Sequence, residues 1–194
     1  LDIPDDAVVA LYVGRFNPRE KMNPALLALT MEKAVQATGR PIYWVNSGWA
    51  ETAAEAALYH EGARALCPSV HYREVDGRPP DVRFSIWSVG DFFISLSDNI
   101  QETFGLTPLE AASFGKPSIV LRWGGFVDTM VENVTAVFVD SPTPDNIRHA
   151  LAVVDERTWD AERIVEHADR FSEDVFVEAI RGLVKEHLAA YDAR

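Results

Sequence analysis

Short, strongly apolar segments alternate along the chain with longer segments of helical composition. The apolar segments are residues 8–13, 42–46, 70–75, 92–96, 118–121 and 136–139. Runs such as VVALYV and FFISL are apolar at consecutive positions, which is typical of strands that are covered on both faces. Covered strands that alternate with helices indicate a parallel sheet. We therefore predict a six-stranded parallel sheet.

The intervening segments carry helix start and stop signals. They predict helices over residues 24–38, 52–66, 82–89, 107–114 and 127–132. Three further helices, over residues 144–155, 159–170 and 175–191, follow without intervening strands, and we expect them to pack on the flank of the sheet. The predicted fold class is α/β, a doubly wound, Rossmann-like parallel sheet with extra C-terminal helices. Ligands bind such sheets beyond the carboxyl ends of the strands.

Composition restricts the cellular compartment and the binding partners that we expect. The 194 residues contain no low-complexity linker and no internal repeat, so we expect one domain over residues 1–194. A net charge of -12 argues against nucleic acid as a partner, and no apolar run is long enough for a membrane span. A single Cys67 indicates a reducing, cytoplasmic setting. The first residues, LDIPDD, do not resemble a signal peptide, and we expect the chain to begin partway through a longer protein.

Several common sites are missing from the sequence. It contains no G-x-G-x-x-G, no G-x-x-x-x-G-K-[ST] and no G-x-S-x-G, which excludes the usual dinucleotide, P-loop and serine hydrolase motifs. The five His residues lack the spacing of zinc ligands, and there is no Asp-x-Asp. We therefore expect no metal and no other cofactor.

The loop after the first predicted strand brings two cations to the carboxyl edge of the sheet. Gly14 is expected to let the backbone turn sharply, and Arg15 and Lys21 then lie where they could grip a diphosphate. The alternative is a solvated, salt-bridged loop in which these cations pair with neighbours such as Glu20.

A second signal marks the start of a helix. Thr107 is predicted as the N-cap, with Pro108 in the first helical position and Glu110 in the third, and Gly115 ends the helix. The side chain of Glu110 could equally turn back on Thr107 as part of a capping box.

Free N–H groups near this helix start would form an anion site. We expect the amides of Phe104, Gly105 and Leu106 to face the crevice and to receive a phosphate. Glu102 and Glu110 would approach the same crevice, and carboxylates beside a phosphate commonly accept hydrogen bonds from sugar hydroxyls. A nucleotide sugar satisfies both features. For Glu102 the alternative is an ordinary surface carboxylate.

Together these motifs resemble a known enzyme family. Gly14-Arg15, Lys21, the ETFGLTPLEA segment from Glu102, the following FGKP and the loop Trp123-Gly124-Gly125 occur in consistent order over nearly the whole chain. They resemble the C-terminal, donor-binding domain of retaining GT-B glycosyltransferases of family 4 (group 1). Met22 departs from the family, which usually has Gly after the lysine.

The resemblance implies roles for individual residues. Arg15 and Lys21 would bind the diphosphate together with the amides from Phe104 to Leu106, and Glu110 would bind the ribose. Glu102 would contact the donor sugar, either as a nucleophile or as an electrostatic stabiliser. The donor would be a nucleotide-diphosphate sugar. The acceptor would bind an N-terminal domain that is absent from this chain, so the isolated chain would bind the donor without turnover.

The resemblance also implies metal-independent, retaining hexosyl transfer, and a full-length protein that is cytoplasmic or peripheral to a membrane. Two alternatives remain. One is a GT-B epimerase or a phosphorylase-like enzyme. The other is a noncatalytic α/β regulatory domain, which we disfavour because Asp5 and Asp6 precede the first strand instead of following it.

Overall fold

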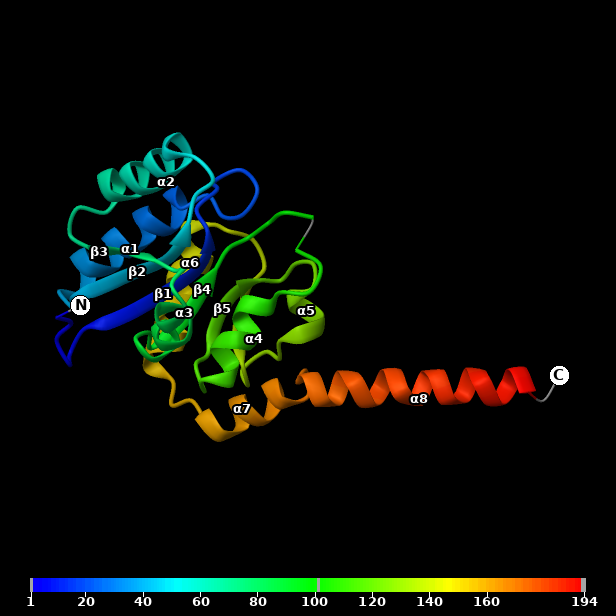
Figure 1. Cartoon of the computed structure of the whole chain (residues 1–194). Coiled ribbons are helices and arrows are strands. Elements are labelled where there is room, and N and C mark those ends of the chain that lie inside the picture. Colours follow the sequence, from blue (N-terminus) through cyan, green and yellow to red (C-terminus); the bar gives the residue numbers. More distant parts are fainter. Residues whose placement is uncertain (1, 101, 193–194) are drawn as a thin grey trace.

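The computed structural model describes residues 2–100 and 102–192. Six parallel strands form one sheet in the order β3-β2-β1-β4-β5-β6 (Figure 1). The strands are β1 (Val8–Arg15), β2 (Ile42–Trp49), β3 (His71–Asp76), β4 (Phe92–Ser95), β5 (Ser118–Leu121) and β6 (Ala136–Val139). The predicted number and direction of the strands are confirmed.

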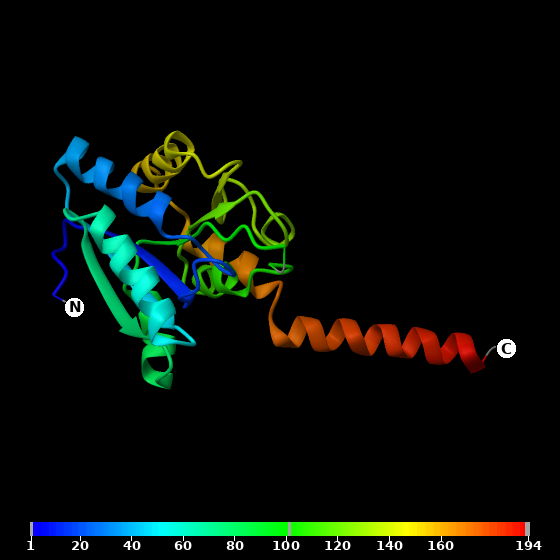
Figure 2. The ribbon, with the colours of Figure 1, turned by 90° about the horizontal axis from the view of Figure 1, so that it is seen from above.

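Helices cover both faces of the sheet (Figure 2). One face packs against α1 (Ala25–Thr38), α2 (Ala53–Leu66) and α6 (Pro144–Glu156). On the other face lie α3 (Pro80–Ser85), the 3-10 turn η1 (Ile86–Ser88) and α4 (Leu106–Ser113). The remaining helices are α5 (Phe126–Thr129), α7 (Ala161–Asp169) and α8 (Glu173–Asp192).

The continuous apolarity of β1 follows from this two-sided cover. Alternate side chains of a strand point to opposite faces of a sheet. Ala10 and Tyr12 accordingly belong to the core under α1, α2 and α6, whereas Val9 and Leu11 belong to the core on the other face. All four residues are buried, so no position in this stretch of β1 could be polar without a buried partner.

The strand order places a topological switch between β1 and β4. From β1 the chain winds outward to β2 and β3, and it then returns to β4 on the other side of β1. The connections leaving β1 and β4 therefore diverge at their carboxyl ends, and a crevice opens between them. The predicted site residues follow these two strands.

Three local predictions are wrong. The backbone does not turn at Gly14, which is a paired residue within β1; a Cβ there would lie 2.8 Å from the Tyr12 hydroxyl, so glycine provides space instead of a turn. The predicted helix over residues 82–89 divides into α3 and η1. The predicted helix over residues 127–132 is only the short α5.

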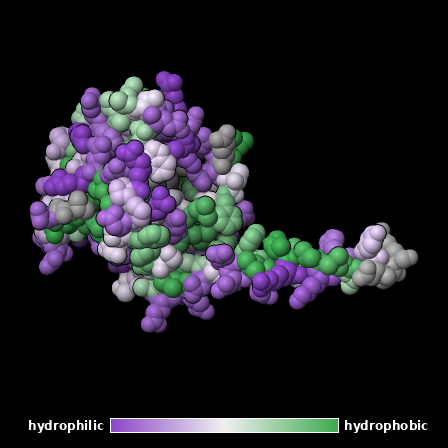
Figure 3. Space-filling view, in the orientation of Figure 1, coloured by the Kyte–Doolittle hydropathy of each residue, from purple (hydrophilic) through white to green (hydrophobic). Residues whose placement is uncertain are grey.

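The predicted packing of the last three helices holds for two of them. α6 packs on the sheet through Ile147 and Leu151, and α7 packs against α4 through Ile164. α8 instead projects away from the rest of the molecule, with an apolar stripe along its surface (Figures 1 and 3). The exposed large apolar side chains of α8 are Val175, Phe176, Ile180, Leu183, Val184, Leu188 and Tyr191. Within residues 2–100 and 102–192, no helix combines the length and apolarity that a bilayer crossing requires.

Candidate functional site

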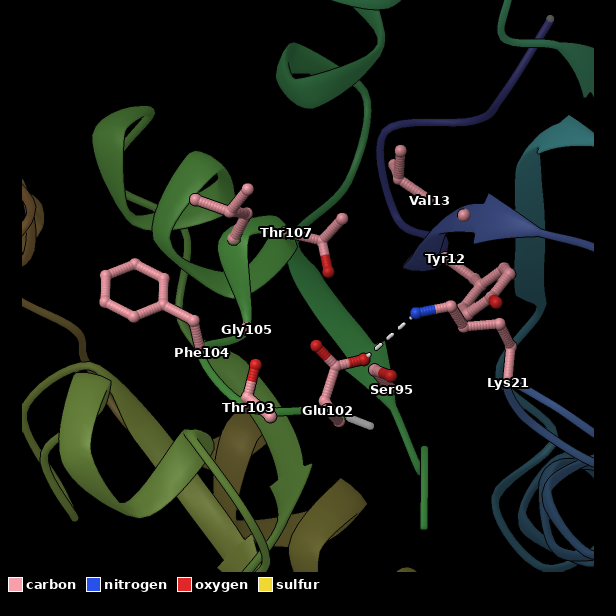
Figure 4. Close-up of a pocket in the computed structure, with 11 residues that line it drawn as sticks. Tyr12, Val13, Lys21, Ser95, Glu102, Thr103, Phe104, Gly105 and Thr107 are labelled. Atoms are coloured by element: carbon pink, nitrogen blue, oxygen red, sulfur yellow. Dashed lines mark hydrogen bonds and ion pairs between the residues drawn. The ribbon is translucent and has the colours of Figure 1, made fainter. Parts of the chain in front are cut away.

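A cavity of about 290 Å³ lies at the carboxyl ends of β1 and β4, where the strand order predicts a ligand (Figure 4). Its lining comes from the end of β1, the loop before α1, the end of β4 and the start of α4. The lining residues are Tyr12, Val13, Gly14, Lys21, Ser95, Glu102, Thr103, Phe104, Gly105, Leu106 and Thr107. Six predicted site residues, Gly14, Lys21, Glu102, Phe104, Gly105 and Leu106, are therefore together in one cavity.

Lys21 and Glu102 face each other across this cavity. Lys21 Nζ lies 3.4 Å from Glu102 Oε2, and both side chains are largely shielded from solvent (Figure 4). A short turn holds Lys21: its N–H donates to the carbonyl of Asn17, whose side-chain oxygen accepts from the backbone of Arg19 and Glu20. The cation is thus supplied by an ordered loop.

Met22 follows Lys21 at the position where glycine was expected, and the loop accommodates its side chain. Its side chain is fully buried in the core, and its sulfur accepts a hydrogen bond from the N–H of Leu96 at 3.3 Å. This contact ties the loop before α1 to the end of β4. Met22 therefore anchors the loop that carries Lys21, and Lys21 still lies beside Glu102.

Arg15 lies at the end of β1, beside the cavity but outside its lining. Its guanidinium donates to Glu51 at 2.6 Å and lies 3.7 Å from Glu20. The salt-bridged loop, which was the alternative for this segment, is therefore present. Both cations of the predicted diphosphate site are paired with carboxylates.

The start of α4 contributes backbone to the cavity, although its cap differs from the prediction. Thr107 is not the N-cap: the helix begins one residue earlier, at Leu106, and Gly105 caps it in the left-handed region with φ 80°. A Cβ on Gly105 would lie 2.5 Å from the Phe126 ring, which excludes side chains here. The first N–H groups of any α-helix lack intrahelical partners, so this end offers donors to an anion. At the other end of α4, Gly115 adopts φ 70° as predicted.

Glu110 lies on α4, one turn beyond the cavity lining, and its side chain is exposed. It does not form the predicted capping box, because Thr107 is not the cap. Partial desolvation of the carboxyl raises the pKa of Glu110, and the nearby positive charge of Arg83 on α3 opposes this shift. Its ribose contact stays a prediction.

Five lining residues were not among the predicted site residues: Tyr12, Val13, Ser95, Thr103 and Thr107. Val13 and Ser95 lie at the ends of β1 and β4, and their position in a parallel sheet was the available signal. Tyr12 looks like an ordinary core residue in sequence. Burial, with a smaller contribution from Glu102, raises the pKa of Tyr12 well above its usual range, so its hydroxyl stays protonated and donates to the carbonyl of Arg15 at 3.0 Å.

The loop from Trp123 to Gly125 packs against the backbone that precedes α4, where the Gly125 N–H donates to the carbonyl of Glu102 at 2.9 Å. The Trp123 side chain is exposed. Among the described residues, no group of three or more His, Cys, Asp or Glu side chains is arranged to hold a metal ion. The cavity therefore offers a cation, a carboxylate and backbone donors.

Comparison with known proteins agrees with this arrangement. Residues 85–173, which include β4, the start of α4 and the following loop, match the family model described as glycosyl transferases group 1. A D-inositol 3-phosphate glycosyltransferase of Corynebacterium efficiens is 28% identical over 178 residues, which cover 89% of this chain and 41% of the relative. The corresponding enzyme of Corynebacterium diphtheriae is 30% identical over 177 residues, again 89% of this chain and 41% of the relative. The chain thus spans less than half the length of these relatives.

Solved structures share the fold over nearly the whole chain. A glycosyltransferase from Rickettsia africae superimposes with a TM-score of 0.72 at 20% identity, covering 96% of this chain and 49% of that one. Anabaena HepE, solved with UDP and glucose, gives a TM-score of 0.66 at 17% identity, covering 95% of this chain and 48% of the other. Both matches use about half of the larger structure. Residues 85–173 therefore match the glycosyl transferases group 1 family model, and the chain as a whole shares its fold with about half of each of these glycosyltransferase structures.

Proposed function

We propose that the chain is the donor-binding half of a retaining, metal-independent hexosyltransferase and holds a nucleotide-diphosphate sugar. The observation that carries this proposal is the single cavity in which Lys21, Glu102 and the start of α4 meet at the β1–β4 switch point. The acceptor would bind a separate N-terminal domain, in agreement with the half-length matches to relatives and solved structures.

The site chemistry suits departure of a diphosphate. Breaking the bond between the sugar and the diphosphate develops negative charge on the leaving oxygen, so donors that tighten on that charge lower the barrier. Lys21 and the first N–H groups of α4 would stabilise this charge, and Arg15 would add its guanidinium after releasing Glu51. No step in this scheme requires a metal.

Glu102 would act on the sugar side of the same bond. The Glu102 carboxylate pairs with Lys21 at 3.4 Å. When the diphosphate replaces Glu102 as the partner of Lys21, the Glu102 carboxylate can stabilise the positive charge that develops at the reacting carbon, as carboxylates do in glycoside hydrolysis. Donor binding would therefore free the negative charge of Glu102 beside the reacting carbon.

Calorimetry with UDP, GDP and ADP, each with and without EDTA, tests donor binding. We expect one of the three to bind, with unchanged affinity in EDTA. Lys21→Ala and Arg15→Ala should each weaken binding about ten- to hundredfold, because a hydrogen bond to a charged group contributes about 1.5 to 3 kcal/mol.

Matched controls are Lys33→Ala on α1 and Arg40→Ala, which pairs with Asp155 far from the cavity. Neither should alter the affinity. If the folded chain binds none of the nucleotides at millimolar concentration, the proposal is wrong. Retention is tested on the full-length protein, by the NMR coupling of the anomeric proton in the product.

A further inference from the structure

The backbone before α4 rests directly on the loop before α5. The Gly125 N–H donates to the Glu102 carbonyl at 2.9 Å, and a Cβ on Gly125 would lie 2.3 Å from the backbone nitrogen of Phe104. This approach is possible only for glycine. The cavity-lining segment from Glu102 to Gly105 is thus supported from behind by α5 and its preceding loop.

Thr129, at the end of α5, reaches the same segment with its side chain. It is buried, 1% exposed, and its hydroxyl oxygen lies 3.0 Å from the carbonyl of Phe104 and 2.9 Å from the carbonyl of Gly125, to which it donates. In a trans peptide the carbonyl and the next N–H point in opposite directions. By holding the Phe104 carbonyl, Thr129 therefore fixes the direction of the Gly105 N–H on the other side of that peptide.

His167, on α7, holds Thr129 in turn. Its Nε2 lies 2.7 Å from the Thr129 carbonyl, and because a carbonyl can only accept, Nε2 carries the proton. His167 is itself buried. The Phe171 ring completes the support, with its centroid 5.5 Å from the His167 ring and 5.9 Å edge-to-face from the Phe104 ring.

We propose that Thr129 and His167 are positioning residues that aim the Phe104–Gly105 peptide at the donor diphosphate. Neither residue lines the described cavity, so each acts through the backbone of Phe104. Donors stabilise a developing charge only when they are fixed in direction before the reaction. This inference rests on the proposed donor-binding function and extends it to residues on α5 and α7.

Paired variants separate positioning from simple packing. Thr129→Val nearly keeps the side-chain volume and His167→Phe keeps an aromatic ring, but both remove the hydrogen-bond donor. Thr129→Ser and His167→Gln retain a donor. The control is Thr135→Val, because Thr135 is an equally buried threonine whose hydroxyl hydrogen-bonds to the backbone of Val131, away from Phe104. Thermal melting of each variant verifies that it is folded.

The experiment measures the affinity of each variant for the preferred nucleoside diphosphate and for the corresponding nucleoside, which lacks phosphates. Thr129→Val and His167→Phe should each bind the diphosphate about 3- to 10-fold more weakly, the effect of one misplaced hydrogen bond, and should bind the nucleoside unchanged. The Ser, Gln and Thr135→Val variants should stay near wild-type affinity. In NMR spectra, the shift of the Gly105 amide on adding the diphosphate should shrink in Thr129→Val.

Failure of this inference differs from failure of the proposed function. If the wild-type chain binds the diphosphate and folded Thr129→Val and His167→Phe bind it equally well, Thr129 and His167 have no positioning role. Equal weakening of diphosphate and nucleoside would also overturn it, since that pattern indicates general disruption. If the wild-type chain binds no nucleotide, the proposed function itself is wrong and the role of these residues falls with it.

Discussion

At the scale of single residues, the two candidate diphosphate-binding cations already have partners. Arg15 donates to Glu51 at 2.6 Å, and Lys21 lies 3.4 Å from Glu102. A diphosphate must therefore replace carboxylates before it gains these cations. The carboxylates hold the cations in place without a ligand, but they also reduce the net gain on binding, because the original ion pairs are lost.

Glu51→Gln should tighten nucleoside diphosphate binding. The substitution frees Arg15 from its shortest ion pair but keeps the shape of the side chain. Exposed ion pairs contribute about 0.2 to 1 kcal/mol, so we expect a gain in affinity of up to about fivefold by calorimetry. Glu178→Gln, which frees Arg181 on α8 in the same way, is the control and should change nothing. Unchanged or weaker binding in Glu51→Gln would show that Arg15 does not contact the ligand.

These ion pairs mark the limit of prediction from sequence. The residue types and their order placed Lys21, Glu102 and the α4 start at one sheet edge, because parallel strands share that edge. The partners of Arg15 could not be derived in the same way, since Glu51 comes from the loop after β2, thirty-six positions away. Contacts of this kind depend on how the loops pack.

At the scale of elements, tertiary contact overrode one local signal. The sequence Thr107-Pro108 favours a helix that is capped by threonine, yet α4 begins at Leu106. Gly105 can cap the helix because its left-handed backbone lets it lie against the Phe126 ring of α5. The ring comes from a distant segment, so the helix start was visible in sequence only to within about two residues.

For α8 the opposite holds: the predicted helix is confirmed, but its predicted packing is wrong. Its apolar positions recur as they do on an amphipathic helix, and the helix forms. We expected it to flank the sheet, but α6 packs on the sheet and α7 packs against α4, whereas α8 projects away from the rest of the molecule (Figure 1). The pattern predicts that a face will be buried without indicating what buries it.

Removal of residues 175–194 should leave the rest of the chain intact. Because the apolar side chains of α8 are exposed, their loss should change the free energy of unfolding by no more than about 0.5 kcal/mol, measured by urea denaturation followed by tryptophan fluorescence. Ile164→Ala on α7 serves as the contrast. That side chain is fully buried against α4, so its truncation should cost about 2 to 5 kcal/mol. A large loss on removing α8 would mean that it stabilises the body.

At the scale of the whole molecule, one buried aromatic cluster joins several elements of the fold. It lies in the core under α1, α2 and α6 and includes the imidazole of His60. The His60 ring lies 4.4 Å from the Phe16 ring, and its Nδ1 shares a hydrogen bond with the Tyr72 hydroxyl at 2.6 Å. This cluster links β1, α2 and β3, so its protonation state bears on the stability of half of the sheet.

The chain should lose stability as the pH falls through the titration of His60. Burial lowers the pKa of His60, with Arg64 acting in the same direction and Glu74, 3.4 Å from Nε2, opposing it. The unfolded chain therefore binds a proton at a higher pH than the folded chain does. Unfolding is favoured as the pH decreases from the usual histidine value of about 6.5, and the contribution is fully present above that value.

Urea denaturation between about pH 7.5 and 5.5 measures this dependence. In the wild-type chain the free energy of unfolding should decrease across the window. His60→Gln can still bond to Tyr72 but cannot take up a proton, so its free energy of unfolding should decrease less steeply. His187→Gln is the control, because His187 lies on the exposed helix α8, where its Nδ1 contacts the Leu183 carbonyl of the same helix. Equal slopes for wild type and His60→Gln would assign the pH dependence to other groups.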